Sequence, residues 1–258
     1  GETADTLASV RAAKELELLT LGVVNVVGST IARETDAGVY NHAGPEVAVA
    51  STKAFVSQLT VLVLLTLLIG RERGMSQAEG QELAEGLQAL PAIIATYLED
   101  TSSIQTAAAQ FAGYRDAMFI GRKFHTPIAY DGALKLKEVT YIHAEAYAGG
   151  ELKHGPIAML SPEFPVIAIV PQDDVYEKMV SNIEEVKARG APVLALVHEG
   201  DAALTELADA VITMPKVHPA LQPIVSTIPL QLLSYYIGVE KGYNVDRPRN
   251  LAKSVTVE

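Results

Sequence analysis

A lysine and a glutamate stand three positions apart in a segment with helical spacing, at Lys135 and Glu138. Side chains at i and i+3 share one face of a helix. On a protein surface such a pair is common and has no function. A carboxylate on a rigid helix can, however, take a proton from a substrate carbon. The helix should follow a strand that ends at Gly121, and open α/β sheets bind ligands in the crevice at such strand ends. The pair is therefore a candidate acid–base site, with a solvated surface pair as the alternative.

A second candidate is the glycine-containing segment that carries His154. Gly149 and Gly150 allow backbone amides to approach a ligand closely, and a histidine titrates near neutrality. A plain glycine turn with an exposed histidine is the alternative. Four side chains of this region are potential metal ligands: His143, Glu145, Glu151 and His154. Their spacing matches no zinc motif, so we predict no metal site.

The two ends of the chain hold further polar groups. Thr3 precedes a helical pattern, where a hydroxyl and the helix dipole can bind phosphate, although a simple N-cap is the better explanation of this residue taken alone. The last residues, 243–258, are polar and irregular and include Lys253. Taken alone, such a segment is typical of a frayed terminus.

Composition narrows the possible functions. The 258 residues carry a net charge of -11 and contain no cysteine. A thiol nucleophile, a disulfide scaffold and a zinc–cysteine site are thereby excluded, and a broad nucleic-acid surface is disfavoured. An anionic small substrate remains possible, because a pocket can be locally positive. The longest apolar run, 59–69, would rise only about 16 Å as a helix, which favours a buried core helix over a membrane span.

The candidate residues need a scaffold, and the hydrophobic pattern predicts one. Helices are expected over 3–19, 51–69, 76–97, 127–141, 174–189 and 221–238, and strands over 21–27, 38–40, 117–120, 165–170, 192–197 and 211–214. Strands that alternate with helices predict parallel sheets covered on both faces. Two such runs, each closing on a long apolar helix, indicate a duplicated α/β unit whose first copy is short of strands.

Six segments carry a family resemblance: 1–8, 49–55, 132–138, 143–147, 150–156 and 248–258. In this order they resemble the glutamine:fructose-6-phosphate aminotransferases (isomerizing), or glucosamine-6-phosphate synthases. The resemblance implies two flavodoxin-like sugar isomerase (SIS) subdomains with parallel sheets. It also implies a glutaminase domain in cis, upstream of Gly1, and a first subdomain that is incomplete at its N-terminus.

The resemblance also implies an internal organisation. The first SIS subdomain is expected over 1–72, a helical connector over 73–105, and the second SIS subdomain over 106–242. Residues 243–258 become a C-terminal active-site tail instead of a frayed end. The substrate is expected to be fructose 6-phosphate and the product glucosamine 6-phosphate, in a cytoplasmic homodimer that needs no cofactor and no metal.

Individual roles follow by matching residues to the family's motifs. Glu138 resembles the base that moves a proton between C1 and C2, and Lys135 its neighbour in proton handling. His154 resembles the histidine that opens the sugar ring and reaches into the partner subunit's site. Lys253 resembles the lysine that forms an imine with the C2 ketone. Thr3 resembles a residue of the family's phosphate site, and Val49 and Ser51 resemble its sugar contacts.

Two other functions remain open at this point. A SIS-domain deglycase or deaminase acting on an amino-sugar phosphate would share the fold and the glutamate. A non-catalytic sugar-phosphate sensor would need the phosphate site, but neither Glu138 nor Lys253. The presence of both side chains favours an enzyme, and the C-terminal segment 250–258 favours the synthase.

Overall fold

The computed structural model describes residues 1–254, and their contacts divide the chain into two compact units. Unit 1 comprises residues 1–73 together with the segment that begins at Asp246. Unit 2 comprises Gly74–Val245. The predicted connector over 73–105 thus belongs almost wholly to unit 2, and most of the predicted tail belongs to unit 1.

Unit 1 is built around a small parallel sheet. Strand β1 (Leu21–Val24) pairs in register with β2 (Ala37–Tyr40), and the short helix α2 (Thr30–Glu34) connects them. Two further helices complete the unit, α1 (Ala4–Glu15) and α3 (Lys53–Glu72).

The expectation of a buried core helix over 59–69 is wrong for the described residues. Of the 20 residues of α3 only Val61 is buried, while Leu62, Leu64 and Leu68 are at least half exposed. A two-stranded sheet is too narrow to cover a helix of this length. By length and composition alone α3 is apolar enough to cross a membrane. Core helices of globular proteins pass the same test, so this is weak evidence for a membrane span.

Unit 2 contains a five-stranded parallel sheet in the order β4-β3-β5-β6-β7. The strands are β3 (Asp116–Gly121), β4 (His143–Ala148), β5 (Val166–Val170), β6 (Val193–His198) and β7 (Ala210–Met214). Numbered within the unit, this order is 2-1-3-4-5, the flavodoxin-like arrangement. The predicted fold class is confirmed.

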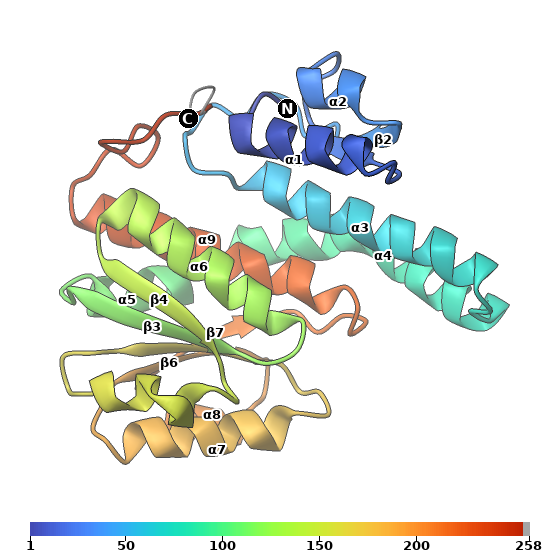
Figure 1. The fold of residues 1–258 in the computed structure, drawn as a ribbon. Coiled ribbons are helices and arrows are strands. Elements are labelled where there is room, and N and C mark those ends of the chain that lie inside the picture. The colour runs from blue at the N-terminus through green and yellow to red at the C-terminus, as the bar shows by residue number, and fades with distance from the viewer. Residues whose placement is uncertain (255–258) are drawn as a thin grey trace. The chain divides into compact units, whose positions relative to one another are not determined.

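Helices cover both faces of this sheet (Figure 1). One face carries α5 (Ser102–Phe111), α6 (His125–Thr140) and α9 (Gln222–Glu240), and the other carries α7 (Tyr176–Lys187) and α8 (Ala202–Leu207). The unit begins with α4 (Gln77–Glu99), which starts in a capping box between Ser76 and Glu79. Two 3₁₀ turns, η1 (Leu152–His154) and η2 (Pro156–Met159), follow β4.

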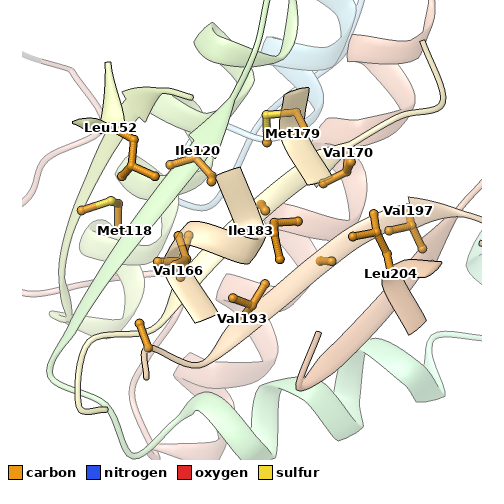
Figure 2. Packing of buried hydrophobic residues seen from close by; sticks show 14 residues of the cluster. Met118, Ile120, Leu152, Val166, Val170, Met179, Ile183, Val193, Val197 and Leu204 are labelled. Carbon is orange, nitrogen blue, oxygen red and sulfur yellow. The ribbon is translucent and has the colours of Figure 1, made fainter. Parts of the chain in front are cut away.

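The core of unit 2 explains why its central strands are uniformly apolar. Every residue of β5 and β6 is buried, because both faces of these strands are covered. Between the sheet and α7, Ile120 and Val166 pack with Met179 and Ile183, all 1% exposed or less (Figure 2). Leu152 joins the same cluster, so the segment that carries His154 is fixed to the core at its start.

Candidate functional site

Lys135 and Glu138 form an ion pair near the C-terminal end of α6. The Lys135 ammonium donates to Glu138 Oε2 at 2.5 Å, and the two side chains are 5% and 21% exposed. A solvated surface pair, the alternative considered from the sequence, is therefore wrong. A buried charge is costly unless it is paired, so each member of this pair requires the other.

The expected location of this pair at the carboxyl end of a strand is wrong. The helix does start directly after β3, but Lys135 is ten positions beyond its first residue, His125. At 1.5 Å per residue the pair lies about 15–20 Å along the helix, toward the opposite edge of the sheet. The strand-end crevice therefore does not contain it.

Asp131 lies on the same face of α6 and was missed from the sequence. It stands four positions before Lys135 and seven before Glu138, a spacing that aligns side chains on one helix face. Burial raises the pKa of Asp131 to about 6; Lys135 opposes this shift and Glu138 adds to it. The i, i+4, i+7 spacing was the signal that could have identified this carboxyl group.

His154 ends the turn η1 and is exposed, whereas Leu152, two positions earlier, is fully buried. Next to it, Lys153 forms an ion pair with Glu185 at 2.6 Å. The chain then turns at Gly155, whose φ of +139° is a conformation that only glycine adopts readily. The imidazole is thus presented outward directly after two anchored residues, Leu152 and Lys153.

Gly149, in the loop before this turn, has a packing role. A Cβ at this position would lie 2.8 Å from Asn182 Oδ1 on α7. The main-chain N–H of Gly149 donates to the carbonyl of Gly121. Asn182 in turn accepts from the Arg122 guanidinium at 2.9 Å. The predicted close approach therefore occurs, but the group approached belongs to the protein.

Among residues 1–254, no group of three or more His, Asp or Glu side chains is arranged to hold a metal ion. His143 instead contacts Asp116 at 3.2 Å and Glu145 at 3.5 Å. The edge strand β4 and its neighbour β3 bring these three side chains together.

Lys253 is held within unit 1 by three acceptors. Its ammonium donates to Glu46 Oε2 at 2.9 Å, to the carbonyl of Ala48 at 2.8 Å and to the carbonyl of Val49 at 3.4 Å. The Val49 N–H also donates to the carbonyl of Asp246 at 3.0 Å. The polar tail is thus bound to the loop that precedes α3, at least through the described residues; 255–258 lie outside them.

The other predicted sugar contacts also belong to unit 1. Ser51 is partly buried in the loop before α3. Thr3 is the N-cap residue of α1, but its side chain makes no capping hydrogen bond. The structure therefore gathers Val49, Ser51 and Lys253 on one loop-and-tail segment of unit 1, while Lys135, Glu138 and His154 belong to unit 2.

A cavity of about 590 Å³ in unit 2 is lined by α4 and by the carboxyl ends of β6 and β7. Its lining includes Tyr97, His198 and Lys216, and none of the residues predicted from the sequence. Burial raises the pKa of Tyr97 and lowers that of His198. This cavity is separate from the Lys135–Glu138 pair.

Comparison with known proteins gives concordant results. A family model described as the SIS domain matches residues 1–68 and 110–240. The chain is 50% identical over 258 residues to the glutamine–fructose-6-phosphate aminotransferase [isomerizing] of Chlorobaculum tepidum, and 49% identical over 259 residues to that of Thermus thermophilus. All of this chain is covered, but only 42% and 43% of these relatives.

Solved structures agree with the sequence matches. The glucosamine-6-phosphate deaminase of Thermotoga maritima is 22% identical with a TM-score of 0.75, which demonstrates a shared fold only. The C-terminal domain of the glucosamine-fructose-6-phosphate aminotransferase from Francisella tularensis is 40% identical, with a TM-score of 0.89. The match covers 96% of this chain and 71% of that domain. The chain therefore belongs to the SIS domain family and, within it, to the C-terminal isomerase domains of the glutamine–fructose-6-phosphate aminotransferases.

Proposed function

We propose that this chain converts fructose 6-phosphate and ammonia into glucosamine 6-phosphate, the isomerase part of the aminotransferase reaction. The observation that carries this proposal is the partly buried Lys135–Glu138 ion pair in a chain of this family. A carboxylate fixed by a buried lysine is a suitable group to accept a proton from a sugar carbon. The chain spans less than half the length of its curated relatives, so a glutaminase domain in cis supplies the ammonia in this proposal.

The proposed reaction begins with ring opening by His154, which presents its imidazole outward. The ammonium of Lys253 and the C2 ketone then give a protonated imine and water, and ammonia replaces the lysine on C2. Glu138 accepts a proton from C1 and returns it to C2, which produces the C1 aldehyde and the C2 amine. Lys135 stabilises the Glu138 carboxylate before the proton is taken and after it is returned, and no cofactor takes part.

Substrate binding is assigned to unit 1. Thr3 contributes a hydroxyl at the start of α1, where the helix dipole favours a phosphate. Val49 and Ser51 contact the sugar from the loop before α3. We further propose that two chains form a cytoplasmic dimer, with each His154 serving the site of the other chain. The exposure of His154 supports this arrangement.

Borohydride trapping tests the proposal on the full-length protein incubated with fructose 6-phosphate. The expected result is a sugar adduct on the peptide that contains Lys253, and its loss in Lys253→Arg. Glu138→Gln should retain the adduct but lose at least about 100-fold in isomerase turnover, the size of effect typical of a general base. An adduct that persists in Lys253→Arg contradicts the imine assignment, and normal turnover in Glu138→Gln contradicts the base.

An ammonia assay separates this function from the deaminase alternative. The synthase reaction consumes ammonia in the presence of fructose 6-phosphate. A deaminase or deglycase would release ammonia from an amino-sugar phosphate, and a sensor would bind sugar phosphate without turnover. Either of those results would replace the proposed function.

A further inference from the structure

Glu46 occupies an unusual position for a loop carboxylate. Its side chain is only 9% exposed, and its two oxygens have different partners. Oε1 accepts from the main-chain N–H of Thr52 at 2.7 Å and of Ala54 at 3.2 Å, at the start of α3. Oε2 accepts from the Lys253 ammonium at 2.9 Å. The backbone of α3 thus fixes one half of the carboxylate and leaves the other half for Lys253.

The ammonium of Lys253 is fully satisfied in this arrangement. A lysine ammonium has three N–H donors, and Glu46, Ala48 and Val49 supply three acceptors. Glu46 is the only charged group among these three, while the two carbonyls fix the direction of the ammonium. Val49 is also a proposed sugar contact, so Lys253 lies beside the position assigned to the sugar.

The charge state of Glu46 is consistent with this geometry. Burial by itself would raise the pKa of Glu46. The hydrogen bonds from Lys253 and from the N–H groups of Thr52 and Ala54 outweigh burial, and the pKa lies below its usual value. A carboxylate with these donors remains ionised across the physiological range. It is a counter-ion and a poor base.

We propose that Glu46 is the positioning residue for the imine-forming lysine and the counter-ion of the protonated imine. This inference rests on the proposed function, because it assigns Glu46 a role through Lys253. The ammonium and the ketone together give a protonated imine and water, so the positive charge stays on the lysine nitrogen. Two of the three ammonium protons leave with the ketone oxygen as water, so Glu46 faces one positive charge on the lysine nitrogen before and after the reaction.

Glu46→Gln is the informative variant, because the glutamine amide oxygen can still accept from Thr52 and Ala54. The change removes the charge facing Lys253 and preserves the hydrogen bonds to α3. We expect the rate of borohydride trapping at saturating fructose 6-phosphate, and the isomerase kcat, to fall about 10- to 100-fold. KM and the melting temperature should change little, whereas a purely structural role would lower the melting temperature first. Glu46→Asp, which keeps the charge at a greater distance, should recover part of the loss.

Glu79→Gln is a matched control. Glu79 is also a carboxylate at the start of a helix, where it accepts from the Ser76 N–H at 2.8 Å. The Glu79→Gln variant should leave the rate of borohydride trapping and the isomerase kcat unchanged.

The outcomes separate the two proposals. If the wild-type protein forms no adduct on Lys253, the proposed imine mechanism fails. If it forms the adduct and Glu46→Gln traps at the wild-type rate, the imine stands and the role of Glu46 is refuted. If Glu46→Gln does not fold, the trapping rate of Glu46→Asp takes its place: a rate below that of the wild type supports the role of Glu46, and the wild-type rate refutes it. Slower trapping at an unchanged melting temperature supports the inference, and wild-type trapping overturns it.

Discussion

Asp131, Lys135 and Glu138 place two carboxyl groups and one ammonium on a single face of α6. One lysine cannot fully compensate two neighbouring carboxylates in a partly buried environment. Burial raises the pKa of Asp131 to about 6, the Glu138 carboxylate adds to this shift, and Lys135 only partly opposes it. The raised pKa means that Asp131 titrates near the pH at which a sugar isomerase would work, so the net charge around Glu138 changes over that range.

The titration of Asp131 predicts a pH-dependent stability. A pKa raised from 3.8 to about 6 means that the folded state binds the proton more tightly than the unfolded state. The stabilisation is complete below the unfolded pKa and is lost as the pH rises through about 6. Between pH 4 and pH 7, Asp131→Asn should therefore gain up to about 3 kcal/mol relative to wild type.

Urea unfolding at several pH values, on both proteins, measures this difference. A free-energy gap between variant and wild type that stays constant from pH 4 to pH 7 would show that Asp131 titrates normally.

Sequence patterns revealed some of these residues and not others. Lys135, Glu138, His154 and Lys253 belong to recognisable motifs. Glu46 and Asp131 do not, because their importance depends on partners. The partners of Glu46 include a lysine that lies about 200 positions away, and no local pattern reports such a contact. The expected position of the Lys135–Glu138 pair was also wrong. The pair lies ten or more positions along α6 and is therefore far from the end of the strand that precedes this helix.

The contact of α6 with its neighbours depends on a glycine. A Cβ at Gly132 would lie 2.9 Å from Leu230 Cδ1 on α9 and 2.9 Å from Phe119 Cε1 on β3. Both of those side chains are fully buried and cannot move away freely. This close packing fixes the helix that carries Lys135 and Glu138 against the sheet.

Gly132→Ala should therefore destabilise the protein, although alanine is the better helix former. We expect the overpacking to outweigh the helix propensity, with a net loss of about 1–2 kcal/mol in the free energy of unfolding. Leu134→Ala, on the exposed face of the same helix, is the control and should cost about 0.5 kcal/mol or less. Thermal or urea unfolding checks both, and a stabilised Gly132→Ala protein would refute the packing argument.

The hydrophobic pattern identified most helices and strands, but its failures are instructive. The central strands β5 and β6 are continuous apolar runs that only a doubly covered parallel sheet explains. The edge strand β4 contains His143, Glu145 and three alanines. It has none of the β-branched residues typical of a strand, so the hydrophobic pattern did not predict it. The short helices α2 and α8 have too few turns to give a clear period, whereas α5 buries Ile104, Ala107, Ala108 and Phe111 at helical spacing and could have been predicted. The exposure of α3 was not predictable, because it depends on how much of unit 1 is available to cover it.

The two units should differ in their ability to fold alone. Unit 2 is one continuous segment, 74–245, with a complete sheet and a dense core. We expect this fragment to unfold cooperatively in urea, with coincident transitions by circular dichroism and by tyrosine fluorescence. The fragment 1–73 lacks the segment that begins at Asp246 and should show no cooperative transition. A non-cooperative 74–245 fragment would show that its core depends on unit 1.

The contact between Lys253 and Ala48 joins residues 205 positions apart. On the ribosome, residues 1–73 emerge before unit 2, yet the segment that completes their unit is made only after all of unit 2. At about 5–20 residues per second this delay is roughly ten to thirty seconds. During that time the Glu46 carboxylate has no lysine, and the exposed leucines of α3 are available to chaperones. The lysine proposed to form the imine is therefore made only after all of unit 2, so a chain that stops before it cannot begin the proposed chemistry.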